Sequence, residues 1–465
     1  MTIRVPTLLL CLFCCLPTLS VAQSLVQNEQ YAQYDSDRLP ASFHRSRRDS
    51  VVAHMSANSA ALFLGGVEKN RANDVSYEFH QDPNFYYLTG HIQPNAALLI
   101  IKEKEQAVRQ ILFVEAKNPA RETWTGIRLG TDGAKRILGF EEAEVIDSLP
   151  SVLSSLLPRI ETFYYSPNYG MKVVDPAIDS GFGLSSTVVS ILERRYPKLV
   201  IRSLLPILSR LRMVKTTEEL VLMRKAVSIS NEGHNEIMRT VQPGWYEYQM
   251  QALGEYVFKR HGAEYTGYPC IVGSGNNSTI LHYETNRRKT ESGDFVEMDI
   301  GAEYHGYSAD VTRSFPVNGT FTPEQRAIYE IVLEAQDSGI AAVTVGGEFR
   351  AAHYAALSVI QRGLLKLGII STPNEAIRYF MHGTSHFLGL DVHDAGVPGP
   401  LPENAVITVE PGIYIPAGSP CDPKWWKIGC RIEDDILVTA SGPEILSSGS
   451  PRRIQEIEAL MKKGK

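Results

Sequence analysis

Several features that would assign a class of protein at once are missing from this 465-residue chain. Basic residues are not in excess: 46 Lys and Arg stand against 52 Asp and Glu, giving a net charge of -6. The positive surface that a phosphate backbone requires is therefore not indicated, and we expect no nucleic acid among the partners. Beyond the N-terminus no apolar stretch reaches the roughly 20 residues that span a bilayer, so we expect no stable membrane anchor.

The first 22 residues have the pattern of a signal peptide. Arg4 supplies the positive start, an apolar run extends from Leu8 to Leu16, and Ser20-Val21-Ala22 provides small residues at a cleavage site. The run breaks at Pro17, too early for a membrane-spanning helix. We therefore expect an exported protein, periplasmic or secreted after signal-peptide cleavage.

Cysteine is scarce once this segment is removed. Of the six cysteines, the mature chain keeps only Cys270, Cys421 and Cys430, too few for a disulfide scaffold. The spacing of Cys421 and Cys430 is compatible with a disulfide in an oxidising compartment and equally with two independent thiols. Cys270 is typical of a small buried residue.

The length and the apolar patterning predict two domains. Residues 35–205 alternate short apolar runs, such as 60–64 and 97–101, with helical stretches, which predicts an α/β domain. This domain has no Gly-rich phosphate loop, no G-x-S-x-G motif and no cluster of metal ligands, so we expect a structural role for it. Residues 212–462 form a mixed α+β domain, with helix-start signals at Thr216-Thr217-Glu218-Glu219 and Thr322-Pro323-Glu324-Gln325.

The most informative stretch is the segment from Phe295 to Arg313. It predicts two strands joined by a turn at Tyr304-His305, with Asp299 and Asp310 directly opposite one another on one face. Their Cβ atoms would lie about 5 Å apart, where two ionised carboxylates repel by roughly 3 kcal/mol at an effective dielectric constant of about 20. Either a shared proton or a divalent cation would neutralise them.

Three further candidate ligands favour the cation, each next to a strand or turn: His386, Glu410 and Glu433. Four carboxylates carry a charge of about -4, which two divalent ions balance, so the charge favours a dinuclear site. Four oxygen donors and one imidazole suit Mn²⁺ better than a thiolate-seeking Zn²⁺. The absence of an H-E-x-x-H motif excludes the commonest mononuclear zinc peptidases.

The ordered series Asp299, Asp310, His386, Glu410 and Glu433 resembles the metal site of the pita-bread metallopeptidases, which include methionine aminopeptidase, aminopeptidase P and prolidase. Residues 382–394 and 271–283 are similar to aminopeptidase P. Residues 77–90 are similar to the creatinase-like N-terminal domain of that family. The resemblance implies an α+β pita-bread catalytic domain preceded by a creatinase-like α/β domain, and it spans nearly all of the mature chain.

The resemblance also implies a reaction, the release of the N-terminal residue from peptides with proline in the second position. Asp310 and Glu433 would bridge two metal ions, Asp299 would bind one ion, and His386 with Glu410 would complete the other. A hydroxide between the ions would be the nucleophile, and Glu410 would pass its proton to the leaving nitrogen.

The family pattern assigns the substrate contacts as well. His282 and His393 would donate hydrogen bonds to the tetrahedral intermediate, and His382 would contact the substrate. Arg431, two residues before Glu433 and therefore on the same strand face, would hold this bridging carboxylate and stabilise developing charge. A proline ring would lie against Tyr268, Leu281 and His282, and the family suggests a homodimer or homotetramer.

Three alternatives stay open at this point. A prolidase shares the fold and the metals but cleaves only Xaa-Pro dipeptides. A creatinase uses the fold without metal, which gives no reason for five ligands. A non-catalytic binding module of the same fold would be expected to have lost ligands. Separately, Trp425 and Trp426 are compatible with lining the substrate pocket or with packing a loop.

Overall fold

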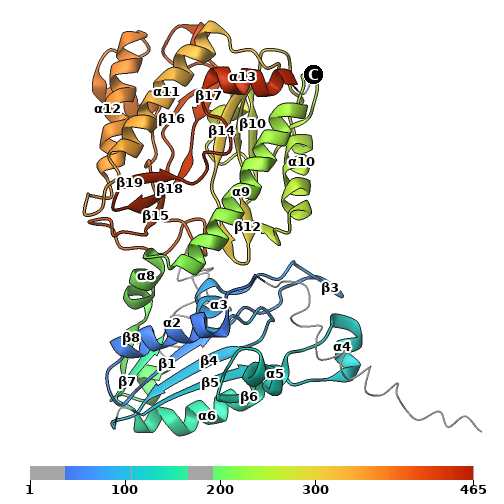
Figure 1. Ribbon diagram of the computed structural model, residues 1–465, viewed down its shortest axis with the longest axis vertical. Coiled ribbons are helices and arrows are strands. Elements are labelled where there is room, and N and C mark those ends of the chain that lie inside the picture. The colour runs from blue at the N-terminus through green and yellow to red at the C-terminus, as the bar shows by residue number, and fades with distance from the viewer. Residues whose placement is uncertain (1–36, 106, 166–191, 464–465) are drawn as a thin grey trace, which may run out of the picture.

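The computed structural model describes residues 37–105, 107–165 and 192–463. Two domains are joined by the helix α8 (Leu205–Met213), with the N-terminal domain in blue to green below the catalytic domain in Figure 1. The predicted signal segment, residues 1–22, lies outside the described residues. Within the described ranges no helix is long and apolar enough to cross a membrane.

The N-terminal domain is built on a six-stranded mixed sheet in the order β6-β5-β4-β1-β7-β8. The apolar runs predicted at residues 60–64 and 97–101 form central strands of this sheet, so the predicted α/β fold of the N-terminal domain is confirmed. The strands are β1 (Ser59–Leu64), β4 (Ala97–Lys102), β5 (Val108–Val114), β6 (Glu142–Val145), β7 (Thr162–Tyr165) and β8 (Val200–Ser203).

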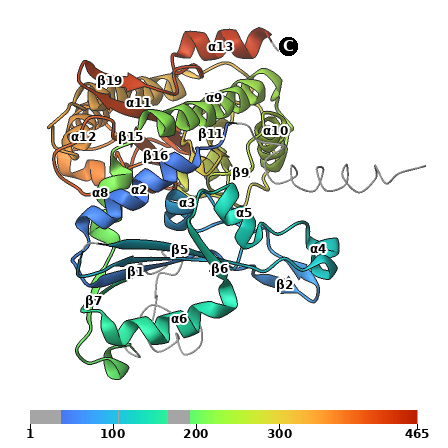
Figure 2. The same ribbon diagram turned by 60° about the horizontal axis from the view of Figure 1, so that its bottom comes forward.

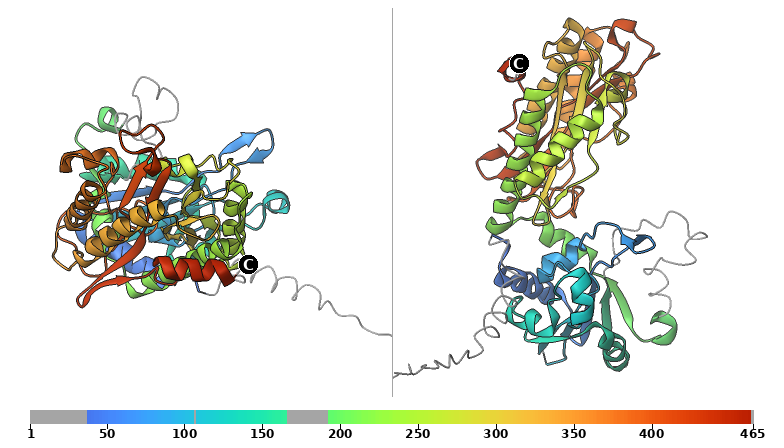
Figure 3. Two further views of the ribbon diagram at one scale, coloured as in Figure 1. Left: turned by 90° about the horizontal axis from the view of Figure 1, so that it is seen from above. Right: turned by 90° about the vertical axis from the view of Figure 1, so that its right-hand side faces the viewer.

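Helices cover both faces of this sheet, which explains why its central strands are apolar throughout. Leu98 and Ile100 of β4 belong to the core on one side, whereas Leu99 and Ile101 belong to a second core on the other. Figure 2 shows α6 below the sheet and α2, α3 and α5 above it, toward the catalytic domain, with α4 to one side. The helices are α2 (Ala41–His54), α3 (Pro83–Thr89), α4 (Pro119–Thr125), α5 (Gly130–Arg136) and α6 (Leu149–Leu156); the short hairpin of β2 (Asn70–Ala72) and β3 (Val75–Ser76) projects from the domain (Figure 3).

The catalytic domain encloses its strands between two helix pairs, α9 with α10 and α11 with α12 (Figure 1). The helices are α9 (Thr217–Thr240), α10 (Glu247–Arg260), α11 (Pro323–Ala341), α12 (Ala351–Lys366) and α13 (Ile454–Lys463). The strands are β9 (Tyr265–Thr266), β10 (Ile271–Ser274), β11 (Phe295–Asp299), β12 (Ala302–Tyr304), β13 (Tyr307–Ser308), β14 (Thr312–Pro316), β15 (Val406–Val409), β16 (Gly412–Ile415), β17 (Ile428–Arg431), β18 (Asp434–Thr439) and β19 (Gly442–Ile445).

Both helix starts expected from the sequence are present. The side chain of Thr216 accepts a hydrogen bond from the Glu219 backbone N–H, and the Glu219 side chain accepts one from the Thr216 N–H. The same reciprocal pair joins Thr322 and Gln325 at the start of α11. These two capping boxes satisfy backbone donors that a helix leaves unpaired at its N-terminus, so α9 and α11 begin where the sequence predicts.

The hairpin that carries two of the candidate ligands differs from the prediction by one residue in its turn. Its loop is His305-Gly306, with φ values of 49° and 85°, and Asp299 pairs with Thr312 rather than with Asp310. A two-residue loop with positive φ at both positions favours glycine at the second, which centres the turn one residue later than predicted. The prediction that Asp299 and Asp310 are directly opposite is therefore wrong.

The tip of this hairpin contacts the N-terminal domain through histidine–carboxylate pairs. His80 Nε2 lies 2.8 Å from Glu303 Oε1. His305 lies between two acids, with Nδ1 2.6 Å from Glu264 Oε1 and Nε2 2.9 Å from Asp37 Oδ1. Burial opposes the positive charge of His305, but these hydrogen bonds outweigh it and raise its pKa above 6.5.

The stability of the protein is therefore expected to depend on the charge of His305. Below pH 6.5 the folded and unfolded states both carry the proton and the ion pairs contribute fully; the contribution is lost as the pH rises through the raised folded pKa. We expect His305→Asn, which tolerates positive φ, to lower Tm by about 2–4 °C at pH 6 and by less at pH 9, as measured by thermal unfolding. The exposed His54→Asn is the control, and an equal Tm loss for His305→Asn at both pH values would contradict the prediction.

Candidate metal centre

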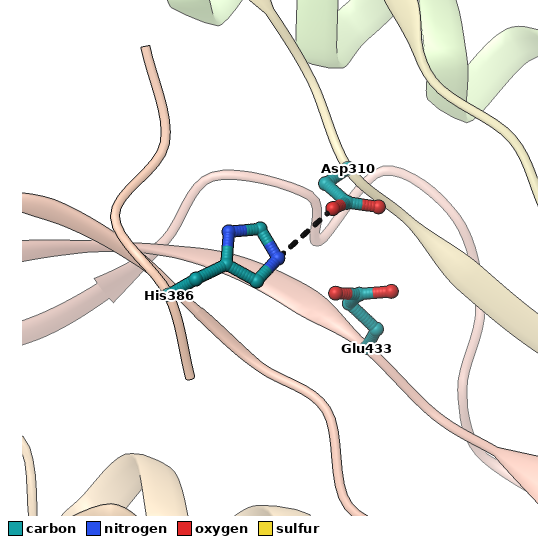
Figure 4. Close-up of side chains that lie close together, drawn as sticks. All are labelled: Asp310, His386 and Glu433. Atoms are coloured by element: carbon teal, nitrogen blue, oxygen red, sulfur yellow. Dashed lines mark ion pairs between the residues drawn. The ribbon is translucent and has the colours of Figure 1, made fainter. Parts of the chain in front are cut away.

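Three of the five predicted ligands converge at the centre of the catalytic domain. Asp310, His386 and Glu433 each offer a ligand atom within 4.8 Å of the other two. Figure 4 shows the imidazole and the two carboxylates pointing toward one another, with His386 Nε2 3.2 Å from Asp310 Oδ2. Because these residues come from the segments before β14, before β15 and between β17 and β18, the fold brings together positions far apart in the sequence.

His386 and Glu410 share one face of a strand-like pairing with β15. Thr408 N–H donates to the His386 carbonyl at 3.0 Å, and Glu410 N–H donates to the Thr384 carbonyl at 2.9 Å. In this antiparallel register His386 stands opposite Thr408, and Glu410 follows two residues later on the same face. The result is a separation of 3.7 Å between His386 Nε2 and Glu410 Oε1.

The orientation of the His386 ring is fixed by its second nitrogen. Nδ1 lies 3.1 Å from the Phe387 carbonyl oxygen, which can only accept, so Nδ1 carries the hydrogen. Nε2 therefore faces Asp310; without a cation it donates to that carboxylate, and although burial opposes the charge, Asp310 and Glu410 raise the pKa of His386 to about 9. A backbone carbonyl in this role is the usual means by which a protein fixes the tautomer of a metal-binding histidine.

Asp299 is held next to this cluster by two neighbours. The Tyr268 hydroxyl donates to Asp299 Oδ1, and Arg431 Nη2 donates to Oδ2 at 2.7 Å. Arg431 Nε also donates to Thr312 Oγ1 at 3.1 Å, and the Thr312 hydroxyl donates to Glu433 Oε2 at 2.6 Å. A continuous chain of hydrogen bonds therefore fixes Asp299 relative to Glu433, and all five predicted ligands belong to one site.

Burial of so many acids in one place raises their pKa values. Burial, and then the charge of Asp299, raise the pKa of Asp310. Burial, and then the charges of Asp310 and Glu410, hold the pKa of Glu433 well above its usual range. Burial raises the pKa of Glu410 to about 7, although His386 and Arg431 oppose the rise. The charges of His386 and Arg431 thus offset only part of the cost of burying these carboxylates together.

Divalent cations fit these residues. The buried Asp310 Oδ1 has no hydrogen-bond partner among the residues that the structure describes, which is costly for a carboxylate oxygen unless another group binds it. Carboxylate oxygens with one imidazole are ligands of Mn²⁺, Zn²⁺ and similar ions, and a cation at this point would offset the mutual repulsion of the acids. These observations support divalent metal ions as the cofactor.

The predicted substrate-contacting residues lie around the cluster with differing exposure. The ring centroids of His393 and His386 are 4.2 Å apart, and His393 is exposed. His382 is half-buried, with Nε2 2.9 Å from Tyr414 Oη and Nδ1 3.7 Å from Glu410 Oε2. His282 is exposed and Leu281 half-buried, on the loop that follows the 3₁₀ turn of residues 275–279. The hydroxyl of Tyr268 is used to hold Asp299, a role that the sequence did not indicate.

The sequence interpretation omitted three residues of the site. Glu297 is buried two residues before Asp299, with Oε1 2.7 Å from Arg431 Nη2. Thr312 stands two residues after Asp310. Tyr414 accepts a hydrogen bond from Arg431 Nη1 at 2.9 Å. Alternation along a strand would have found Glu297 and Thr312, since every second residue faces the same side. No local signal marks Tyr414.

The structure distinguishes the alternatives left open for the pair Cys421 and Cys430 and for the pair Trp425 and Trp426. Among the described residues Cys270, Cys421 and Cys430 are all free thiols, so Cys421 and Cys430 are not joined by a disulfide. Trp425 is buried in the core, and Trp426 donates through Nε1 to the Ser419 carbonyl at 2.9 Å. Both tryptophans therefore pack and tie their own loop.

Two family models match this chain. The model of metallopeptidase family M24 matches residues 221–440, and that of the aminopeptidase P N-terminal domain matches residues 44–164. The Xaa-Pro aminopeptidase of Haemophilus influenzae is 38% identical over 439 residues, covering 91% of this chain and 98% of the relative. The Xaa-Pro aminopeptidase of Escherichia coli is 36% identical over 435 residues, covering 89% and 96%.

Solved structures agree with these matches. Aminopeptidase P from Escherichia coli, solved with the inhibitor Pro-Leu, has a TM-score of 0.84 at 34% identity, covering 92% of this chain and 99% of that one. An aminopeptidase of Pseudomonas aeruginosa has a TM-score of 0.83 at 35% identity, with the same coverage. The fold and the site thus define a metallopeptidase with a pita-bread catalytic domain. The chain belongs to the aminopeptidase P family and is a metallo-aminopeptidase.

Proposed function

We propose that this protein removes the N-terminal residue from peptides whose second residue is proline, with two divalent cations held by Asp299, Asp310, His386, Glu410 and Glu433. The observation that carries the proposal is the convergence of Asp310, His386 and Glu433 within 4.8 Å around a carboxylate oxygen that has no partner. Relatives that are 36–38% identical over almost their full length are named Xaa-Pro aminopeptidases. Four carboxylates and no thiolate ligand favour Mn²⁺.

The reaction adds water across the peptide bond: hydroxide adds to the carbonyl carbon, the C–N bond breaks, and the proline nitrogen takes a proton. When bound, the cations supply an acidified water and stabilise negative charge. Glu410 is in position to take the proton of that water and to deliver it to the leaving nitrogen. Its carboxylate lies between His386 and His382, at 3.7 Å from each.

The remaining residues orient the reacting groups. His393 and His282, both exposed, donate hydrogen bonds to the substrate carbonyl, and His382 contacts the substrate next to Glu410. Arg431 holds Asp299 and, through Thr312, Glu433, so that it fixes the carboxylates and balances part of their charge. Tyr268 fixes the other oxygen of Asp299.

Substrate preference is tested with purified protein and added Mn²⁺ on three peptides: an Xaa-Pro-Xaa tripeptide, the matched Xaa-Ala-Xaa tripeptide and an Xaa-Pro dipeptide. We expect release of the first residue from the proline tripeptide, with kcat/KM at least about tenfold above that for the alanine tripeptide, because a pocket for an apolar ring discriminates by about 1–3 kcal/mol. Cleavage of the dipeptide alone would establish a prolidase instead, and cleavage of none would refute the proposal.

A further inference from the structure

The histidine of the proposed site that lies nearest to His386 is carried by a closed loop. Asp394 N–H donates to the Phe387 carbonyl at 2.8 Å, and inside the loop Gly389 N–H donates to the Asp391 carbonyl at 3.1 Å. The loop thus begins next to His386 and returns to the same place with His393, which brings the two rings to 4.2 Å. Whatever fixes the end of this loop also fixes His393.

The end of the loop is fixed by buried ion pairs. Asp394 accepts from Arg212 Nη2 at one oxygen and from Lys215 Nζ at the other, the latter at 2.8 Å. Arg212 Nη2 donates also to Asp391 Oδ2 at 2.6 Å. The side chains of Arg212, Lys215 and Asp394 are only 1–2% exposed, so water competes little for these bonds.

The backbone of the loop is fitted closely to this cluster. A Cβ on Gly389 would stand 2.1 Å from Asp394 Oδ2 and 2.9 Å from Lys215 Nζ. No side chain could be accommodated there without displacing the ion pair. The loop therefore closes around Asp394 at a distance that only glycine permits, which limits the positions open to His393.

Both cations come from the connection between the domains. Arg212 belongs to α8, and Lys215 lies just before α9. Arg212 Nη1 donates to Asn84 Oδ1 of α3 in the N-terminal domain at 2.9 Å, and Lys215 Nζ donates to the Arg212 carbonyl at 2.8 Å. A single guanidinium, carried by the connecting helix, thus contacts both the N-terminal domain and the histidine loop.

A gain in the free energy of unfolding does not explain why this contact is made by buried ion pairs. Burying two cations with the Asp394 carboxylate costs desolvation that their attraction only partly returns, and apolar residues of similar volume would stabilise the same contact as well or better. Directional ion pairs differ from apolar contacts in that they specify one geometry. The cluster lies where geometry matters for the reaction, one residue from His393.

We propose that Arg212 and Lys215 position His393 for catalysis by fixing Asp394, so that the attachment of the N-terminal domain is part of the catalytic machinery. The inference rests on the proposed role of His393 as a hydrogen-bond donor to the reacting carbonyl. Arg212, Lys215 and Asp394 are positioning residues and do not touch the substrate themselves.

The test is a double-mutant cycle in the full-length, cation-loaded enzyme. Arg212→Lys keeps the charge but cannot reach Asp394, Asp391 and Asn84 together, and Asp394→Asn keeps the shape but removes the charge. Each is expected to lower kcat by about 10- to 100-fold with little change in KM, as a small misplacement of a catalytic group does. Metal content and Tm are measured for every variant, and Arg224→Lys, whose guanidinium pairs with Glu444 on the surface, is the matched control expected to keep parent kcat.

The cycle is completed in the His393→Ala background. If Arg212 acts through His393, Arg212→Lys will change kcat there by less than about twofold, because coupled residues are not additive. A full 10- to 100-fold loss in that background, or parent kcat for both Arg212→Lys and Asp394→Asn, would overturn the inference. Parent kcat for His393→Ala would instead refute the proposed role of His393, on which the inference rests.

Discussion

Replacing Glu433 with alanine is expected to lower kcat by about 10³-fold or more and to leave fewer than two cations bound per chain. Glu433 lies within 4.8 Å of Asp310 and His386 and receives the Thr312 hydroxyl at 2.6 Å, so its carboxylate is central to the ligand set. Loss of a metal-binding carboxylate removes several kcal/mol of transition-state stabilisation, and each 1.4 kcal/mol is about tenfold in rate. Steady-state kinetics and metal analysis of the purified variant measure both effects.

Thermal unfolding separates this loss of function from a loss of fold. Without cations Glu433 is crowded by Asp310 and Glu410, and its pKa is held well above the usual range by burial and these charges. Removing it relieves repulsion and costs one hydrogen bond, about 1 kcal/mol, so the cation-free variant should unfold near the Tm of the cation-free parent. In the parent, added Mn²⁺ should raise Tm because it binds only the folded state; in the variant this rise should be small.

The control for Glu433→Ala is Glu444→Ala. Glu444 is a half-exposed carboxylate on β19 that pairs with Arg224 and lies outside the ligand set. It should retain parent kcat and metal content. Two bound cations and parent kcat in the Glu433→Ala variant would show that the carboxylate cluster is not the catalytic centre.

Local signals in the sequence were sufficient for much of the fold. The capping boxes at Thr216 and Thr322 are complete within four residues, and apolar runs of five or so residues became the central strands of the N-terminal sheet. Such features depend on backbone donors and on side-chain alternation within one element, so distant residues do not alter them. The five candidate ligands were also chosen from the sequence, as four acids and one histidine next to predicted strands or turns; that all five bind metal stays a prediction.

The register of the hairpin that carries Asp299 and Asp310 was predicted wrongly from the local sequence. Alternation fixes which residues share a face but not which residue is opposite, and a turn shifted from Tyr304-His305 to His305-Gly306 moves every partner by two positions. Glycine at the second turn position was the available signal, since positive φ is required there. The prediction that Asp299 and Asp310 share a site was unaffected, since the charge of Asp299 still raises the pKa of buried Asp310.

Most of the contacts that orient the candidate ligands could not be predicted from the sequence; Arg431 was expected to hold Glu433, whereas its direct hydrogen bond goes to Asp299. Arg212 reaches Asp394 across 182 positions, and Arg431 reaches Asp299 across 132. Spacing carries no information on pairs so far apart, because their distance is set by how whole elements pack. Long polar side chains such as arginine add further freedom, since several acceptors lie within their reach. The sequence could therefore supply candidate ligands, whereas most of the groups that hold them appear only in the folded structure.

Glu410→Gln separates the handling of protons from the binding of cations, and kcat is expected to fall by about 10²- to 10⁴-fold even when excess Mn²⁺ keeps the site loaded. Glutamine has the same size and keeps a carbonyl oxygen as a ligand, but it cannot take a proton from water. Glu410 lies 3.7 Å from both His386 and His382, between the metal ligands and the substrate-contacting side.

The pKa of Glu410 determines the direction in which kcat/KM should change with pH. Burial raises the pKa of Glu410 to about 7 without cations, and bound cations will hold it lower by favouring the carboxylate. In the parent, kcat/KM should therefore fall as the pH drops from 7 and Glu410 gains a proton; in Glu410→Gln the residual rate should lack this dependence. The exposed Glu375→Gln is the control and should keep the parent profile. A fully loaded Glu410→Gln enzyme with parent kcat would assign the proton transfer to another group, such as His382, whose Nδ1 lies 3.7 Å from Glu410 Oε2.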